Sequence, residues 1–530
     1  MNSELKPLTI DDGEQTAIAP PPSATHPTRS AGPAAEIAKR ISFFERLISF
    51  PAMLGALLVA GAFLPLRLFV VDPDLWWHIK VGEGILASHR WPTVDPFSFT
   101  VAGQPWMAYE WLGEVLLAAT NRVAGIRGLD ALRIFLCFAV LLAVYALATL
   151  RSGNAKAGFA ATAVLIALTT PSFSGRPQML GYLFLIVTLI LLERFRQGRQ
   201  QALWFLPVLF VLWVNTHGSF VVGIGAIAIY YLGGLREFRA GDIESRRWLP
   251  AERQKLSFVF LLCLAALMIT PYGTRLATYP FDMAFSQPIN VGNILEWQSM
   301  PFNLLGGKLF LALLLGFLIA QATLRLKWRP DEFALFLFGT AMACLHLRFI
   351  LVFVPFCAPL LATILARWTP PYSRAKDLLA MNAAIMALVA AGIFHYFPST
   401  SSLEQSVARD YPVGAVAYLQ QHPVPGRMYN SYGFGGYLIW ALGPDHKVFL
   451  DGRGDVYERG GVLADYLHIA NLKPGAFAVL RSYGIQSCLV ERDEGLAAAL
   501  SNSPEWNKVY SDQLSSLFVR GEAPEPVHAN

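Results

Sequence analysis

The chain has 530 residues, of which 54% are hydrophobic and only 15% are charged, and its formal net charge is +5 at pH 7. About a quarter of the residues of a typical soluble domain are charged, so this composition excludes a soluble globular protein. Many apolar runs approach the roughly 20 residues that a helix needs to cross a bilayer, which predicts an α-helical polytopic membrane protein. The basic net charge does not indicate nucleic-acid binding, because lysine and arginine are concentrated in short segments between the apolar runs.

Residues 1–45 form the first distinct part of the chain, and up to residue 35 they are rich in Pro, Ala, Ser and Thr without periodicity. Such a composition is typical of a disordered tail. The first apolar run starts only near Leu47, too far from the N-terminus for the layout of a cleavable signal peptide. We therefore expect a disordered tail that remains in the cytoplasm.

Residues 46–398 are expected to form a transmembrane domain with about eleven spanning helices. Their approximate ranges are 47–70, 129–150, 157–171, 178–195, 202–216, 219–235, 256–271, 306–324, 333–346, 349–366 and 378–397. With a cytoplasmic N-terminus, the loops on the inner side contain most of the arginine and lysine between the spans. This positive-inside asymmetry assigns loops 72–127 and 272–305 and the C-terminal segment to the outer face.

The outer loop 72–127 begins with Asp72-Pro-Asp74 and is dense in acids and aromatic residues. His78 follows the first acids closely, and Glu110 and Glu114 are four residues apart, which on a helix would put them on one face. The loop also contains five residues of the type that suits a lipid–water interface: Trp76, Trp77, Trp91, Trp106 and Trp111. This density predicts a chemical site on the membrane surface.

Three interpretations of the acids are open. A carboxylate at the edge of a bilayer costs free energy unless it is hydrated or paired, and there it can act as a general base toward a hydroxyl or an amine. Two acids within reach of each other can instead hold a divalent cation. In the simplest interpretation, Asp72 and Asp74 only end the first span and cap the next helix. The second acidic pair and the aromatic density favour a function.

A second group of candidate residues is basic. Arg67 lies at the outer end of the first span, and Arg176 and Arg348 lie at other outer helix ends, with His217 and His346 at the same level. An arginine side chain suits a phosphate because its planar fork donates two hydrogen bonds at once. Alternatively, each of these residues extends its charge toward the headgroups or pairs with an interfacial acid.

The outer loop 272–305 contains Glu296-Trp297, a pair similar to Glu110-Trp111. A long loop over a membrane cavity can serve as a lid or as an acceptor-binding element, or it can be structural only. We assign Glu296 to an acceptor or lid role, together with His78 and Glu114.

Residues 399–530 differ in character, with short apolar runs that alternate with helical patterns. About 120 residues suffice for a small α/β domain with its own core. The expected strands are 427–429, 447–450, 485–491 and 515–519, and the expected helices are 412–421, 433–442, 460–471, 474–483 and 494–502. Tyr429–Gly436 follows a strand and opens a helix, as a phosphate-cradling turn does, but lacks the full G-x-G-x-x-G spacing. Leu450–Asp455 is a polar strand end of the kind that often binds ligands.

The order of these features resembles the GT-C superfamily of membrane glycosyltransferases, which use polyprenyl-phosphate-linked sugars. Protein O-mannosyltransferases, aminoarabinose transferases and oligosaccharyltransferases belong to it. The resemblance lies in a cytoplasmic N-terminus, one span, a large outer loop that opens with acids at Asp72-Pro-Asp74, many further spans and a soluble outer domain. The pattern DLWWHI–DPFSFT–W–EWL is also similar to that of bacterial membrane proteins described as GT-C-like. The resemblance covers most of residues 40–400 and is architectural.

The resemblance implies an inverting displacement of a sugar from polyprenyl phosphate to an envelope glycan, lipid or protein. The catalytic acid of the first loop maps onto Asp74, with Asp72 as the alternative, and Glu110 or Glu296 would supply a second acid. The lipid phosphate would be bound by a basic set comprising Arg67, Arg176, Arg348 and His217. The family's location implies the bacterial cytoplasmic membrane. Because Asp-Pro-Asp replaces the adjacent Asp-Glu of the O-mannosyltransferases, both the identity of the base and the use of a metal stay open, and no resident cofactor is assigned.

Two other functions compete with glycosyl transfer. A transporter or flippase usually has ionisable groups near mid-span and internal repeats, whereas here the ionisable groups cluster at one interface and no repeat is found. A non-catalytic assembly protein would bind an envelope polymer through its C-terminal part, and the acids of residues 72–114 would then be dispensable.

Overall fold

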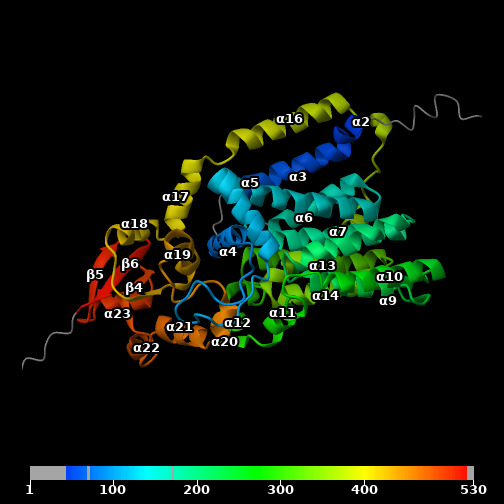
Figure 1. Cartoon of the computed structure of the whole chain (residues 1–530). Helices are drawn as coiled ribbons and strands as arrows, with labels where there is room; N and C mark the ends of the chain where they lie inside the picture. Colours follow the sequence, from blue (N-terminus) through cyan, green and yellow to red (C-terminus); the bar gives the residue numbers. More distant parts are fainter. Residues whose placement is uncertain (1–42, 68–71, 170–171, 522–530) are drawn as a thin grey trace, which may run out of the picture. The chain divides into compact units, whose positions relative to one another are not determined.

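The computed structural model describes residues 43–67, 72–169 and 172–521. The predicted disordered tail, residues 1–35, lies outside the described residues. Contacts divide the chain into two units, Met1–Leu47 and Ile48–Asn530. In the first unit the described helix is α2 (Phe43–Leu47). The second unit contains all the other helices and strands (Figure 1).

A helix lies at each of the eleven positions where a span is predicted. These helices are α3 (Phe50–Leu66), α5 (Trp111–Ser152), α6 (Ala155–Thr169), α7 (Gln178–Arg196), α8 (Leu206–Val214), α9 (Phe220–Leu232), α10 (Pro250–Ala266), α13 (Leu305–Leu324), α14 (Pro330–Leu345), α15 (Ile350–Leu365) and α16 (Leu379–Tyr396). Within the described residues, five helical stretches are long and apolar enough to cross a membrane, namely Trp111–Ser152, Gln178–Arg196, Leu305–Leu324, Leu347–Leu365 and Leu379–Tyr396. The protein is therefore mostly helical with several membrane-spanning candidates, and the number of spans stays a prediction.

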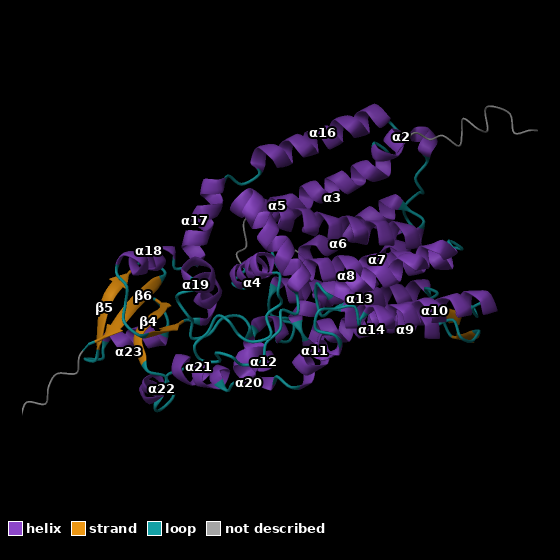
Figure 2. Cartoon of the chain, viewed as in Figure 1, coloured by secondary structure: helices purple, strands orange, loops and turns teal. Residues whose placement is uncertain are grey.

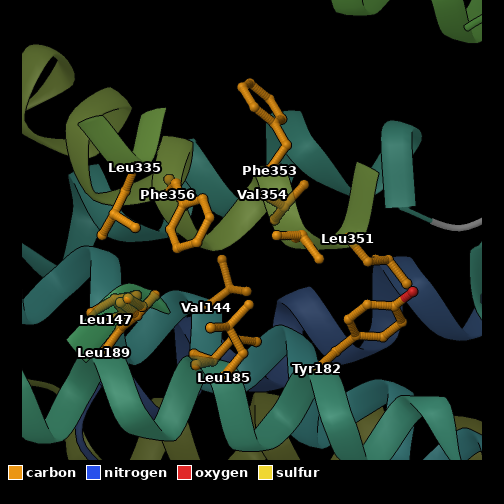
Figure 3. Packing of buried hydrophobic residues seen from close by; sticks show 14 of the residues in the cluster. Val144, Leu147, Tyr182, Leu185, Leu189, Leu335, Leu351, Phe353, Val354 and Phe356 are labelled. Carbon is orange, nitrogen blue, oxygen red and sulfur yellow. The ribbon is translucent and has the colours of Figure 1, made fainter. Parts of the chain in front are cut away.

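The centre of the helical bundle is α15, which is buried along most of its length. A helix that is hydrophobic all round packs inside its neighbours, and α15 does so against α5, α6, α7 and α14. Figure 3 shows side chains of α5, α7, α14 and α15 interdigitating; the labelled ones are Val144, Leu147, Tyr182, Leu185, Leu189, Leu335, Leu351, Phe353, Val354 and Phe356. In contrast, α16 buries only Asn382 among its described side chains, as a helix facing lipid would.

The helix α5 begins earlier than the sequence predicts. Its first turn starts at Trp111, not near residue 129, and the helix is interrupted at Gly125, where φ is 57°. Glycine adopts this backbone conformation without steric cost, and a break in the hydrogen-bond ladder bends a helix. The predicted span 129–150 is therefore only the second part of α5, and the first part belongs to the acid-rich end of the bundle.

The loops predicted for the inner side lie together at one end of the bundle. There Arg151 pairs with Glu332, the Arg329 and Glu193 side chains are 2.6 Å apart, and Arg196 and Asp331 are 3.1 Å apart. A short hairpin of β1 (Phe238–Ala240) and β2 (Ile243–Ser245) lies at the same end, where Ile243 bridges to Trp328. The candidate acids lie at the opposite ends of α5 and α7.

The C-terminal part combines short helices with a four-stranded sheet, coloured orange in Figure 2. Its elements are α17 (Thr400–Asp410), α18 (Val413–Gln421), β3 (Arg427–Asn430), α19 (Gly435–Leu442), α20 (Gly454–Arg459), α21 (Val462–Ala470), α22 (Ala476–Ser482), β4 (Ile485–Glu491), α23 (Gly495–Ser501), β5 (Trp506–Ser511) and β6 (Ser515–Arg520). The strand order is β3-β4-β6-β5, with β3 and β4 parallel and the other pairs antiparallel.

Three of the four predicted C-terminal strands are confirmed as β3, β4 and β6. The strand predicted at 447–450 is wrong, because Val448 makes only an isolated bridge, with Ser98 of the first outer loop. The sequence did not predict β5, α17 or α20. Val448, Phe449 and Leu450 are all buried, and a short run of consecutive apolar residues looks like a buried strand in the sequence whether its partner is a strand or a loop.

The C-terminal part shares its hydrophobic core with the first outer loop and does not close a core of its own. Trp76 of α4 (Leu75–Ser88) packs between Tyr411, Tyr437 and Trp440, with ring centroids 5.4, 5.2 and 4.8 Å away. Trp76, Trp77 and Trp106 are 3%, 1% and 3% exposed. The predicted lipid–water position is therefore wrong for these three tryptophans, because protein covers them.

A buried arginine joins the same two parts of the chain. The Nη1 atom of Arg453 lies 2.6 Å from Asp95 of the outer loop, and its Nη2 atom lies 2.6 Å from Asp451. All three side chains are fully buried, the Tyr457 hydroxyl donates to Asp451, and the guanidinium lies over the Trp106 ring. Both carboxylates are thus paired with one cation from the C-terminal part.

Replacing Arg453 should weaken the packing between the first outer loop and the C-terminal part. Arg453→Met leaves two buried carboxylates without a counter-charge, so we expect the free energy of unfolding to fall by about 3–5 kcal/mol. The measurement is the thermal unfolding midpoint of the detergent-solubilised protein. Arg409→Met, at an exposed arginine of α17, is the matched control and should change the free energy by no more than about 0.5 kcal/mol. Equal midpoints for the two variants would contradict a structural role for the buried cluster.

Candidate active site

The Asp72-Pro73-Asp74 segment enters α4, and its two acids have different local roles. Asp72 is 6% exposed, and its Oδ1 accepts a hydrogen bond from the Asp74 backbone N–H at 3.0 Å. Asp74 occupies the N-cap position of α4, but its side chain makes no capping hydrogen bond. A carboxylate at a helix start normally accepts from the first backbone N–H groups. Local capping therefore does not account for Asp74, whereas Asp72 stabilises the turn.

The Arg176 side chain gathers three acids from distant parts of the chain. Its Nε atom lies 2.5 Å from Asp72 Oδ2, its Nη1 atom 3.0 Å from Asp74 Oδ2, and its Nη2 atom 2.7 Å from Glu296 Oε1. A guanidinium has the planar fork that such convergent pairing requires. Arg176, predicted to bind phosphate, is thus occupied by carboxylates, and Glu296, at the short 3-10 turn Leu295–Trp297, joins the predicted aspartates.

The Asp74 carboxyl titrates near neutral pH. Its burial raises the pKa to about 7, and the nearby Asp72 and Glu296 carboxylates act in the same direction, while Arg176 and the Trp77 hydrogen bond oppose the rise. The indole Nε1–H of Trp77 donates to Asp74 Oδ1 at 3.0 Å. A base with a pKa near the working pH can take up a proton and release it again.

A row of alternating acids and imidazoles lies beside this cluster. Glu110, just before α5, has His78 Nε2 at 3.5 Å from one oxygen and His217 Nε2 at 3.4 Å from the other. The other ring nitrogen of His78 lies 3.1 Å from Glu114. The predicted shared face of Glu110 and Glu114 is thus directed at the two sides of one imidazole.

Burial sets the protonation pattern of this row. It raises the pKa of Glu110 to about 8 and lowers the pKa of His217 to about 3, where Arg348 and Arg176 add to the lowering. Burial also holds the pKa of His78 well below its usual value. At neutral pH the proton therefore resides on the Glu110 carboxyl while both imidazoles are neutral, so the row can donate and accept hydrogen bonds without carrying charge.

Arg348 is the cation of the site that remains available. Its guanidinium lies over the Trp297 ring, 4.5 Å from the centroid, and its backbone carbonyl accepts from the Tyr182 hydroxyl. Within the described part of the chain, Arg348 forms no ion pair. Its charge nevertheless acts on Glu110 and His217, since it lowers the pKa of both. Arg348 is therefore half-buried next to the acids with its charge uncompensated.

Two other predicted residues do not join the cluster. Arg67 ends α3 and lies over the Tyr396 ring of α16, 5.8 Å from its centroid, so the prediction that it converges on the acids is not supported by its contacts. His346 uses its Nδ1 atom on the Trp297 carbonyl at 2.6 Å. The structure thus unites Asp72, Asp74, Glu110, Glu114, His78, Arg176, His217, Glu296 and Arg348.

The sequence indicated Leu450–Asp455 as a possible ligand-binding strand end, but it did not predict that this segment closes the acid site from the C-terminal side. The segment 450–455 lies against α4, and α19 packs on α4 while α20 packs on α12 (Pro288–Asn293) (Figure 1). The Glu458 carboxylate accepts from the backbone N–H groups of Ile289 and Asn290 at 2.9 and 2.7 Å. The polar stretch Leu450-Asp-Gly-Arg-Gly-Asp455 is the sequence feature that pointed to this contribution, because several charged residues after an apolar run need partners when they are buried.

Within the described residues, no group of three or more His, Cys, Asp or Glu side chains has a geometry that could hold a metal ion. Asp72, Asp74 and Glu296 instead surround a guanidinium. The divalent cation considered for this acid group stays a prediction.

No protein-family model and no curated protein matches the chain. Among solved structures, an Archaeoglobus fulgidus oligosaccharyltransferase tethered to an acceptor peptide is similar over 92% of this chain and 76% of its own, with 11% identity and a TM-score of 0.49. ArnT from Cupriavidus metallidurans is similar over 87% of this chain and 97% of its own, with 16% identity and a TM-score of 0.48. The mycobacterial arabinofuranosyltransferase AftD is similar over 89% of this chain and 42% of its own, with 15% identity and a TM-score of 0.49.

These solved structures are glycosyltransferases, the class of enzyme that the sequence resemblance predicts. A second ArnT structure, bound to undecaprenyl phosphate, has a TM-score of 0.42 and 14% identity. Because every one of these TM-scores is below 0.5, we base the function on the side chains of this chain and on its sequence.

The contribution of the Arg176 ion pairs to stability should depend on pH, and replacing Arg176 by an uncharged residue tests this. Arg176 lowers the pKa of Asp74, so its pairing stabilises the fold above that pKa of about 7 and loses this effect as the pH falls through it. We expect Arg176→Gln to lower the thermal unfolding midpoint by more at pH 8 than at pH 5, because the pairing with Asp74 operates only at the higher pH. Arg90→Gln, at an exposed arginine of the same outer loop, should show a small change at both pH values. An Arg176→Gln deficit that is equal at pH 8 and pH 5 would contradict the ion-pair interpretation.

Proposed function

We propose that this protein is an integral membrane glycosyltransferase of the GT-C type, which transfers a hexose or pentose from a polyprenyl-phosphate-linked donor to an envelope glycan, lipid or protein. The observation that carries the proposal is that Asp74, a carboxylate with a pKa of about 7, and Arg348, which forms no ion pair among the described residues, both act on Glu110 at one end of an apolar helical bundle. A lipid-linked phosphate has its charge at the depth of the helix ends and its chain among the helices.

Asp74 acts as the base in this proposal. The acceptor O–H or N–H gives its proton to the Asp74 carboxylate as the acceptor atom forms a bond to the anomeric carbon of the sugar. The bond between that carbon and the phosphate oxygen breaks, and its electron pair leaves with polyprenyl phosphate. One displacement inverts the configuration at the anomeric carbon.

Arg348 stabilises the departing phosphate as its negative charge develops. Arg176 was assigned this role from the sequence, but its three carboxylate partners make it the residue that orients Asp74. Glu110, held between His78 and His217, is the second acid and keeps a proton near the reacting groups. Glu296 connects the loop 272–305 to the same cluster and so suits an acceptor-facing role.

The positive-inside asymmetry supports an orientation for the protein. We assign the N-terminus to the cytoplasm and the acids and the C-terminal α/β part to the outer face of a bacterial cytoplasmic membrane. In this orientation the ionic cluster of Arg151, Glu193, Arg196, Arg329 and Glu332 faces the cytoplasm.

A transporter or flippase is the second candidate, and the buried Asp130–Arg133 pair in α5 is the observation that favours it, since transporters pair charges inside helices. This pair is compensated, because Arg133 contacts Asp130 at 2.6 Å and also donates to the Leu66 carbonyl. Protein that moves a lipid-linked sugar across proteoliposomes without releasing polyprenyl phosphate would favour transport over transfer.

The Asp74→Asn variant tests whether Asp74 is the general base. The purified protein is screened against polyprenyl phosphates that carry a single hexose or pentose, and the release of polyprenyl phosphate is measured. We expect Asp74→Asn to lower kcat about 10²–10⁴-fold, the usual contribution of general base catalysis. For the wild type, kcat/KM should rise with pH to a plateau above about 7, because the base reacts in its ionised form. Asp445→Asn, at an exposed aspartate, is the control, and wild-type release by Asp74→Asn would exclude Asp74 as the base.

Replacing Arg348 tests the phosphate site in the same assay. Arg348→Gln keeps a polar side chain but removes the charge, and we expect kcat/KM for the lipid-linked donor to fall about 10²-fold, as when one donor to a developing anion is removed. Arg275→Gln removes a charge from an exposed position of the outer loop 272–305 and should leave kcat/KM within about 3-fold of the wild type. An equal effect of the two variants would point to a general surface potential instead of a phosphate contact.

A further inference from the structure

A glycine of the C-terminal part lies directly against the candidate base. A Cβ atom built on Gly452 would be 1.6 Å from Asp74 Oδ1, 2.8 Å from its carboxyl carbon and 3.2 Å from Trp77 Nε1. A Cβ contact under 3.0 Å requires one of the groups to move. The backbone of Gly452 therefore forms one wall of the Asp74 carboxylate, and only a residue without a side chain allows this approach.

The Gly452 backbone has little freedom to move away. Its neighbours Asp451 and Arg453 belong to the fully buried ionic cluster that includes Asp95. Its carbonyl accepts hydrogen bonds from the Gly454 N–H at 2.9 Å and from the Tyr432 hydroxyl at 3.4 Å. An added methyl group would thus push on Asp74 instead of shifting the C-terminal segment.

The segment that contains Asp74 is also closely packed, because a second glycine of the C-terminal part contacts the neighbouring Pro73. A Cβ built on Gly436 would be 2.4 Å from the Pro73 carbonyl oxygen. Two glycines of Tyr429–Gly436, where the sequence indicated a weak resemblance to a phosphate-cradling turn, thus lie against protein backbone, namely Gly435 and Gly436. Oδ1 of Asp74 is enclosed by Gly452 and Trp77, while Oδ2 faces Arg176 at 3.0 Å.

From this geometry, we propose that Gly452 is a positioning residue that holds the Asp74 carboxylate against Arg176, so that the active site is completed by the C-terminal part of the chain. This inference rests on the proposed glycosyl transfer for its catalytic consequence, but the contact itself can be tested without any activity. A carboxylate displaced by about 1 Å loses its alignment with the acceptor, which can cost about 10²-fold in rate.

The first test is a stability cycle that needs no substrate. Gly452→Ala should lower the thermal unfolding midpoint in the wild-type background and lower it much less in the Asp74→Ala background, where the opposing carboxylate is gone. Two control substitutions, Gly84→Ala in α4 and Gly433→Ala beside β3, add a methyl group where the nearest atoms are at least 3.5 Å away, and they should be tolerated. Equal losses in both backgrounds would overturn the contact.

The second test uses the polyprenyl-phosphate-linked sugar that the wild-type protein turns over in the screen. Gly452→Ala should lower kcat about 10²-fold with KM for the donor within about 3-fold of the wild type, and it should cause no further loss in the Asp74→Asn background. Wild-type kcat, or the same fold-loss in the Asp74→Asn background, would overturn positioning through Asp74. If the wild-type protein releases no polyprenyl phosphate, the proposed function fails while the stability cycle still decides the contact.

A gentler variant covers the case in which Gly452→Ala does not accumulate as folded protein. Tyr432→Phe removes the hydroxyl that donates to the Gly452 carbonyl and adds no atoms. A loss of kcat that disappears in the Asp74→Asn background would support the proposal, and wild-type kcat would count against it.

Discussion

The ion pairs of Arg176 with three carboxylates hold the candidate active site together. Asp72 and Asp74 lie at the start of α4, Glu296 lies in the loop 272–305, and Arg176 precedes α7, so one side chain joins three distant segments. Three acids around one guanidinium leave an excess of negative charge. Burial raises the pKa of Asp74 to about 7, and Asp72 and Glu296 add to the rise while Arg176 opposes it. The ion pair that assembles the site therefore limits how far burial raises the pH at which Asp74 accepts a proton.

A second constraint is the core that the first outer loop shares with the C-terminal part. Trp76 is covered by C-terminal aromatic residues, Trp77 lies against glycines of the C-terminal part, and Arg453 pairs with both Asp95 and Asp451 in the same interior. Neither the loop nor the C-terminal part could bury these groups alone, because the apolar surface and the counter-charges come from opposite sides. Close backbone approach at Gly452 and Gly436 is a consequence of this packing. The candidate base Asp74 is thus surrounded by residues of both the first outer loop and the C-terminal part.

The helical positions and three C-terminal strands were predictable from the sequence because hydrophobic runs and periodicity are local signals. The strand expected at 447–450 and the interfacial tryptophans were not, because Val448 and Trp76 owe their environment to partners more than 300 residues away. A tertiary contact between segments closer in the sequence explains the late start predicted for α5. Residues 111–128 are too polar for a membrane span, and their helix is stabilised by contacts with α4.

By itself, the sequence determined that this protein is a helical membrane protein. It also predicted one outer interface for the acids at 72, 74 and 110 and for the basic residues at 67, 176, 217, 346 and 348, because side-chain type and distance from a span end can be read locally. Only the tertiary structure decided how they are paired. In the structure Arg176 pairs with carboxylates, Arg348 has no ion pair among the described residues, and Arg67 lies over the Tyr396 ring. Ion pairing and the pKa of a buried acid depend on distances of a few ångströms between segments far apart in the chain, and no local pattern records those distances.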